Sequence, residues 1–202
     1  MSVMGRPLQA MALAFGELAA DLEAAGELSV TDFAKACSLV SVLFGSLGFA
    51  FKFAEKDYTS KVDDLVQASE RFKTLGSLLE VDVEQGTVRN GGSHSRNLLR
   101  VKRGIEMVKI LFEHILESEC SHLRDSASKA YEAVFSQHHP WAIRKAVAAG
   151  TYTLPSKSQF LKVLKEDDAS ARIHMSGYVG GVKPVIHHVE TLFLSRNLGL
   201  DW

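Results

Sequence analysis

The chain has 202 residues, of which 46% are hydrophobic and 23% are charged, a composition typical of a globular protein and not of a disordered one. Its 23 basic and 24 acidic residues give a net charge of −1, which argues against a protein dedicated to nucleic-acid binding. Two cysteines, Cys37 and Cys120, are too few for a disulfide framework and fit small buried thiols.

Helical periodicity runs through the chain and is punctuated by four prolines, at positions 7, 140, 155 and 184. No alternating, β-branched run has the length of a strand. The expected helices span about 6–26, 31–43, 49–69, 71–85, 93–120, 126–135, 140–150, 156–165 and 168–195. Because no repeat, low-complexity tract or linker separates them, the sequence predicts a single all-α domain over residues 1–202.

Nothing in the sequence predicts a secreted or membrane-spanning chain. The longest stretch without a charged residue, 36–51, is short for a bilayer span and is interrupted by serines and glycines. The first residues lack the regions of a signal peptide, and no lipidation signal is visible. We therefore expect a cytoplasmic protein that contacts membranes transiently without crossing them.

The expected helix over 93–120 has two distinct faces. The first is an ordinary apolar core face, with spacings of three and four residues. It comprises Leu98, Val101, Ile105, Val108, Phe112 and Ile115. The second face is basic where the helix begins and apolar further along. It comprises Arg96, Arg100 and Arg103, followed by Met107 and Leu111.

The helix expected over 49–69 shows the reverse pattern on one of its faces. There, Phe49 and Phe53 are followed by Asp57 and Lys61. Two such helices packed antiparallel would bring their charged ends together above an apolar interior. This is the arrangement of a pocket for an amphiphile, with a polar head at the rim and hydrocarbon below.

Asp57 and Lys61 lie four residues apart, so they share one side of a helix. Such a pair is commonly a solvated ion pair that contributes about 0.2–0.5 kcal/mol. Alternatively, the pair stands at the mouth of a binding site. There the carboxylate accepts from an amide N–H and a hydroxyl, and the lysine attracts an anion. Spacing alone leaves both interpretations open.

Arg96 and Arg100 form either a solvated basic face or an anion site. If Ser93 caps the helix, Arg96 lies in the first turn, where a cation opposes the helix dipole. Like charges four residues apart also repel each other. A phosphate held between the two guanidinium groups would compensate for both effects. The preceding Gly91 and Gly92 would add exposed amide groups, which favour an anion further.

His139 is either a surface or capping residue, or a neutral imidazole that donates to a ligand carbonyl. Trp141 is either a core residue or an amphipathic anchor at a membrane interface. Adjacent histidines on a helix point about 100° apart and are poor joint metal ligands. No nucleophile elbow or zinc-ligand spacing is present, so we expect no metal, no cofactor and no catalytic residues.

Three segments, in order, resemble the signatures of the glycolipid transfer protein family. They are the Asp-x-x-x-Lys element at 57–61, the sequence Ser-Arg-Asn-Leu-Leu-Arg-Val-Lys-Arg-Gly at 95–104, and the His-x-Trp element at 139–141. The similarity covers nearly the whole chain and is greatest to the family's plant cell-death branch. It implies a two-layer sandwich of about eight helices that opens to admit ceramide chains, and a lipid carrier instead of an enzyme.

The resemblance also implies a role for each motif residue. Asp57 binds the amide and hydroxyl of the sphingoid base, and His139 binds the acyl-amide oxygen. Lys61, Arg96 and Arg100 bind the head group. Arg103 supports them.

In the sugar-binding branch of the family, a tryptophan stands at the position of Arg96 and stacks on the sugar. An arginine there is typical of the phosphate-binding branch. The resemblance therefore implies ceramide 1-phosphate and its phyto form as cargo. It also implies transient contact with a membrane surface, and no nucleic-acid partner.

A second interpretation is a sphingolipid sensor or adaptor, which binds the same lipid to regulate protein partners in cell-death or defence signalling. One pocket would serve transfer and sensing alike, so the sequence does not separate them. The apolar ends of the two mixed faces, formed by Phe49, Phe53, Met107 and Leu111, are expected to line the hydrocarbon pocket in either case.

Overall fold

The computed structural model describes residues 5–48, 51–117 and 122–202, and within these ranges the chain forms helices, turns and loops but no strand. The helices are α1 (Pro7–Ala25), α2 (Val30–Ser46), α3 (Lys52–Ala68), α4 (Leu75–Glu84), α5 (His94–Glu117), α6 (Leu123–Val134), α7 (Trp141–Thr151), α8 (Lys157–Val163) and α9 (Asp168–Leu194). A short 3₁₀ helix, η2 (Ser136–His138), joins α6 to α7. Each helix expected from the sequence has a counterpart, and the all-α fold class is confirmed.

Capping residues explain where several helices begin. Ser93 precedes α5 as expected, and its Oγ accepts a hydrogen bond from the backbone N–H of Arg96. The start of α2 differs from the prediction at Thr31, because Ser29 caps the helix by accepting from the N–H of Asp32. In α9, Asp167 forms a capping box with Ser170.

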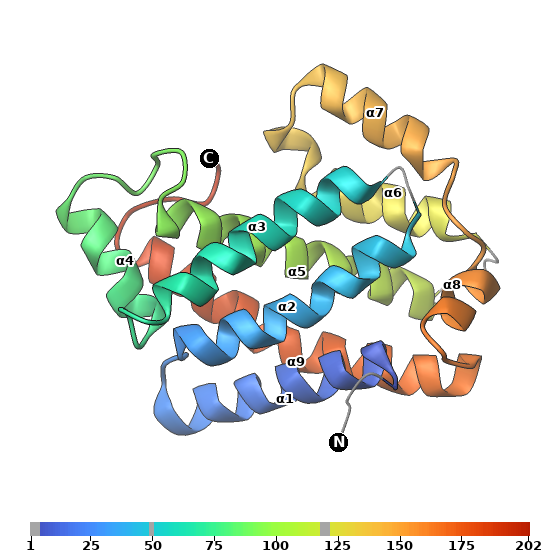
Figure 1. The fold of residues 1–202 in the computed structure, drawn as a ribbon, viewed down its shortest axis with the longest axis horizontal. Coiled ribbons are helices and arrows are strands. Elements are labelled where there is room, and N and C mark those ends of the chain that lie inside the picture. Colours follow the sequence, from blue (N-terminus) through green and yellow to red (C-terminus); the bar gives the residue numbers. More distant parts are fainter. Residues whose placement is uncertain (1–4, 49–50, 118–121) are drawn as a thin grey trace.

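The long helices form two layers (Figure 1). In one layer α1, α2 and α3 lie side by side, and in the other α9 and α6 flank α5. The layers meet where α1 packs on α9 and where α3 packs on α5. The six residues of the apolar face of α5 are all buried between the layers, as expected from their spacing. Among the described residues, no helix combines the length and the apolar character that a bilayer span requires.

The contact between α3 and α5 depends on a glycine. Tyr58 of α3 is buried, and its hydroxyl donates to the backbone oxygen of Cys37 in α2 at 2.9 Å. A Cβ atom on Gly104 of α5 would lie 2.5 Å from Cε2 of the Tyr58 ring. The absence of a side chain at Gly104 therefore lets the two helices that carry the charged motifs approach each other closely.

We expect Gly104→Ala to destabilise the protein, because the fixed Tyr58 ring cannot move away from the added methyl group. Overpacking of this kind costs about 1–3 kcal/mol in free energy of unfolding, measurable by urea denaturation. Gly180→Ala on α9 is the matched control, because a Cβ there meets no atom within 4 Å and an alanine favours the helix. Equal or greater stability of the Gly104 variant would contradict this account of the contact.

Candidate functional site

A cleft of about 380 Å³ lies between α3 and the beginning of α5. It is lined by Ser60, Lys61, Gly91, Gly92, Arg96, Asn97 and Arg100. Three residues predicted to bind a head group thus share one cavity, although Lys61 and the two arginines lie on different helices. Ser60 and Asn97 were not predicted. The signal for Ser60 was its position three residues after Asp57, on the same face of α3.

Asp57 and Lys61 form the ion pair that their spacing allows. The Lys61 Nζ atom lies 2.6 Å from Asp57 Oδ1 and also donates to the backbone oxygen of Asp57 at 3.1 Å. Their burial is unequal: the Lys61 side chain is 12% exposed, whereas that of Asp57 is 49% exposed. The carboxylate therefore holds the ammonium group at the wall of the cleft and still has oxygen atoms open to a ligand.

The guanidinium group of Arg96 is held by a backbone oxygen instead of a carboxylate. Its Nη1 donates to the oxygen of Arg89 at 2.9 Å. Arg89 is itself fastened to the C-terminal segment: its Nη2 donates to the oxygen of Leu198 at 3.1 Å, and its guanidinium lies over the Trp202 ring at 5.4 Å. Arg96 is thus positioned without loss of its charge.

Arg103 lies directly behind the cleft and does not line it. The residue is 6% exposed, and its Nη2 donates to the backbone oxygens of Leu200 and Trp202, each at 2.7 Å. Burial, followed by the nearby positive charge of Arg100, lowers the pKa of Arg103 to about 10. The side chain therefore remains charged at neutral pH, and it fixes the C-terminal segment against α5. This is consistent with the supporting role expected of it.

The first turn of α5 is organised by Asp82, which the sequence did not single out. Its Oδ2 accepts from the backbone N–H of Ser95 at 2.8 Å, and its Oδ1 accepts from Thr87 Oγ1 at 3.1 Å. Together with the Ser93 cap, which accepts from the N–H of Arg96, this carboxylate satisfies two backbone donors in the first turn of α5. Gly91 and Gly92, whose amide groups were expected to favour an anion, line the cleft.

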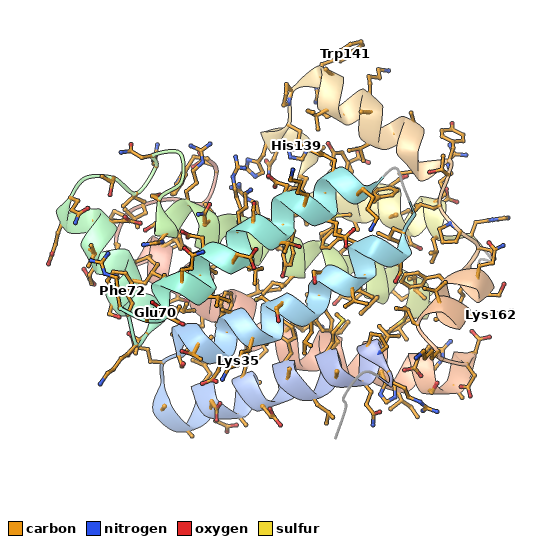
Figure 2. All side chains as sticks on the ribbon, viewed as in Figure 1. Lys35, Glu70, Phe72, His139, Trp141 and Lys162 are labelled. Atoms are coloured by element: carbon orange, nitrogen blue, oxygen red, sulfur yellow. The ribbon has the colours of Figure 1, made fainter. Side chains whose placement is uncertain are left out.

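His139 lies at the connection between α6 and α7 (Figure 2). The following Pro140 disfavours helical backbone at His139, which is extended and ends the 3₁₀ helix. Its Nδ1 is 3.0 Å from the hydroxyl oxygen of Tyr131, and its ring stacks on Phe135 with centroids 5.4 Å apart. Burial, and then the positive charge of Arg100, lower the pKa of His139, while Asp57 opposes them. The imidazole is therefore neutral at pH 7. It lies close enough to the cleft for the charges of Arg100 and Asp57 to affect its pKa.

The remaining predicted residues differ in how deeply they are buried. Met107 and Leu111 continue the basic face of α5 into the core, where they are 9% and 2% exposed. Phe53 is 74% exposed on the first turn of α3, so it lines no interior cavity in this structure, and the expectation that it forms the hydrocarbon pocket is corrected. Phe49 lies outside the described residues. Trp141 is 66% exposed at the outer edge of the molecule (Figure 2).

The cleft carries an excess of positive charge. Lys61, Arg96 and Arg100 are three cations against the single carboxylate of Asp57, which leaves two positive charges uncompensated. Within the ranges that the structure describes, no acidic side chain lies within 4.0 Å of either arginine. By contrast, Lys102 on the neighbouring face of α5 is paired with Glu106 and Glu190. Chemically, the cleft suits a small anion with two charges.

A model of the family described as "Glycolipid transfer protein (GLTP)" matches residues 28–166. The chain belongs to this family. The assignment made from the three motifs is thereby confirmed.

Two curated glycolipid transfer protein relatives span most of this chain. Accelerated cell death 11 of Arabidopsis thaliana is 53% identical over 199 residues, which are 98% of this chain and 97% of that protein. The ceramide-1-phosphate transfer protein of Danio rerio is 31% identical over 176 residues, covering 79% of this chain and 82% of its own.

Among solved structures, a crystal structure of Arabidopsis accelerated-cell-death 11 matches with a TM-score of 0.96 and 52% sequence identity. The match covers 98% of this chain and 100% of that one. That structure holds C12 ceramide-1-phosphate in a variant with asparagine in place of one aspartate. The glycolipid transfer protein fold inferred for this chain is confirmed.

We expect Asp82→Ala to destabilise this protein by about 2–3 kcal/mol. A hydrogen bond to a charged acceptor contributes about 1.5–3 kcal/mol, and a negative charge at a helix N-terminus about 0.3–1 kcal/mol. The measurement is the free energy of unfolding in urea. Glu84→Ala, an exposed residue at the end of the same helix, is the control and should change stability by less than about 0.5 kcal/mol. A similar loss in both variants would contradict the role assigned to Asp82.

Proposed function

We propose that this protein is a non-enzymatic carrier that moves ceramide 1-phosphate, and its phyto form, between membranes. The observation that carries the proposal is the cleft at the start of α5, where three cations face one carboxylate. The bound ceramide-1-phosphate in the Arabidopsis relative, and the name of the Danio rerio relative, support it. In this proposal residues 1–202 act as one domain, in the cytoplasm, and without metal or cofactor.

The head group is selected by charge. A phosphate monoester carries about −1.5 to −2 charges near neutral pH, which matches the two uncompensated positive charges of the cleft. Arg96 and Arg100 supply forked donors suited to phosphate oxygens, and Lys61 adds a point charge. A neutral sugar head would cover the same cations without supplying a counter-ion, which is costly. The geometry therefore favours phosphate over sugar.

The ceramide amide lies between Asp57 and His139 in this proposal. The half-exposed Asp57 carboxylate accepts from the amide N–H and from the sphingoid hydroxyl. The neutral imidazole of His139 donates to the amide oxygen. The Asp57 carboxylate contributes to the electrostatic environment of His139, because its charge raises the pKa of that imidazole.

The hydrocarbon chains occupy the space below, between the two layers of helices. Met107 and Leu111 lie there, directly along α5 from the arginines. Because these side chains are packed in the core, admission of the chains requires the helices around them to separate. Phe49 is proposed for the same pocket from its sequence position alone.

Transfer requires a surface that contacts the bilayer, and we assign this role to Trp141 at the start of α7. Only Thr151 of this helix is buried, so most of α7 faces solvent. Lys145 lies over the Trp141 ring at 5.8 Å, and Arg144 is exposed next to it. An amphipathic indole beside basic side chains is typical of a membrane-interface anchor.

Vesicle transfer of ceramide 1-phosphate and galactosylceramide, measured side by side, tests the head-group assignment. We expect the wild-type protein to prefer the phosphate lipid by at least about thirtyfold, because an unpaired buried charge costs about 2–5 kcal/mol and each 1.4 kcal/mol is a factor of ten. Arg100→Glu removes the excess positive charge and should abolish phosphate lipid transfer. Arg96→Trp should weaken it without creating sugar-lipid transfer, because Lys61 and Arg100 remain.

The matched control is Lys162→Glu, which makes the same reversal of charge at an exposed residue of α8, at the opposite end of the molecule from the start of α5 (Figures 1 and 2). It should leave both transfer rates unchanged. Comparable wild-type rates for the two lipids would refute the arginines as a phosphate selector. Tight binding without transfer would favour the sensor interpretation over the carrier.

Trp141→Ala should lower partitioning onto anionic vesicles about fivefold, corresponding to roughly 1 kcal/mol of apolar contact with the interface. Vesicle co-sedimentation measures the change. Ile173→Ala on α9 is the control, because Ile173 is exposed to nearly the same extent, 68% against 66%. If both variants lose affinity equally, or neither does, α7 is not the contact surface.

A further inference from the structure

The ring of His139 is held by two aromatic residues that no motif predicted. Tyr131 lies on the last turns of α6, eight residues before His139, and its hydroxyl oxygen is 3.0 Å from Nδ1. Phe135 lies between them along the chain, and its ring is stacked on Tyr131 at 6.4 Å and on His139 at 5.4 Å. Between the rings of Tyr131 and Phe135, the imidazole lies with Nδ1 directed at the phenol.

Two proton arrangements satisfy the distance between Tyr131 and His139. In the first, the phenol O–H donates to Nδ1, and the imidazole proton is on Nε2. In the second, Nδ1–H donates to the phenol oxygen, and Nε2 is left as an acceptor. The two differ in function, because only the first gives His139 a free donor for a carbonyl oxygen.

Both groups are neutral in either arrangement, and the hydrogen-bond partner of the Tyr131 hydroxyl favours the first. Burial raises the pKa of Tyr131, so its hydroxyl keeps the proton and remains a donor over the physiological range. Burial and Arg100 lower the pKa of His139, so the ring is neutral and one of its nitrogens is an acceptor. Among the described residues, His139 is the partner found for the Tyr131 hydroxyl. In the second arrangement the hydroxyl proton would be left without that partner.

We propose that Tyr131 is a positioning residue, whose hydroxyl donates to Nδ1 of His139 and thereby keeps the neutral imidazole protonated at Nε2. The Nε2–H group is then oriented and ready to donate to the acyl-amide oxygen of the sphingolipid. The inference rests on the proposed function for its ligand, but the tautomer it assigns is a property of the lipid-free protein.

Long-range ¹H–¹⁵N correlation spectra of the full-length, lipid-free protein test the tautomer directly. We expect the wild-type His139 to show an unprotonated Nδ1 and a protonated Nε2. Tyr131→Phe keeps the ring but removes the hydroxyl, so its His139 should move toward a mixture of both tautomers. Tyr152→Phe, at an exposed tyrosine after α7, is the control and should leave the spectrum unchanged. A proton on Nδ1 in the wild type, or an unchanged tautomer in Tyr131→Phe, would overturn the proposal.

Transfer of ceramide 1-phosphate by the same variants tests whether the tautomer matters. Tyr131→Phe should reduce transfer about threefold to tenfold, the effect of one neutral hydrogen bond. In a His139→Ala background the same substitution should have no further effect, because the two residues act through one contact. An equal loss in both backgrounds would show a merely structural role and overturn the proposal. Failure of the wild type to transfer the lipid at all would instead reject the proposed function, whatever the spectra show.

Discussion

Like charge is concentrated on the first turns of α5, and the site is built around the repulsion that results. Arg96, Arg100 and Arg103 lie on one side of the helix, and the first of them also opposes the helix dipole. The repulsion could be relieved by pairing each arginine with a carboxylate, as Glu106 and Glu190 pair with Lys102 on the adjacent face. Here Arg96 and Arg103 are held by backbone oxygens, which orient a guanidinium group without cancelling its charge.

The use of backbone oxygens to hold these arginines links the cleft to the C-terminal segment of the chain. The oxygens that bind Arg103 come from Leu200 and Trp202, and the residue that binds Arg96 is itself held by Leu198 and Trp202. The C-terminal segment therefore acts as a rigid support behind the cleft. Asp82 accepts from the backbone at the N-terminus of α5, so its carboxylate does not pair with the arginine side chains. Preorganised charge of this kind is costly to the free protein and favourable once an anion is bound.

The sequence predicted the parts of the site that depend on helical spacing alone. The pairing of Asp57 with Lys61, the Ser93 cap and the two faces of α5 follow from local periodicity, and the structure contains all of them. The supports of Arg103 and Arg89 could not be predicted, because they join residues about a hundred positions apart, such as Arg103 and Leu200. Phe53 shows another limit of prediction from sequence. Helical periodicity indicates which apolar residues share one face, but it does not indicate whether another element of the fold covers that face.

The apolar residues predicted for the site differ in burial: Phe53 and Trp141 are exposed, whereas Met107 and Leu111 are buried. A lipid carrier needs buried apolar residues that enclose hydrocarbon chains and exposed apolar residues that contact the bilayer. In the sequence, both kinds of residue belong to the same pattern of helical hydrophobic spacing. The basic face of α5 turns apolar only below Arg103, so a lipid whose phosphate is held at the start of α5 has its chains directed into the core. The charged rim thus fixes the depth at which the lipid lies. In the proposed binding mode Asp57 and His139 stand at the level where polar head and hydrocarbon meet, and a half-buried, neutral imidazole suits that position.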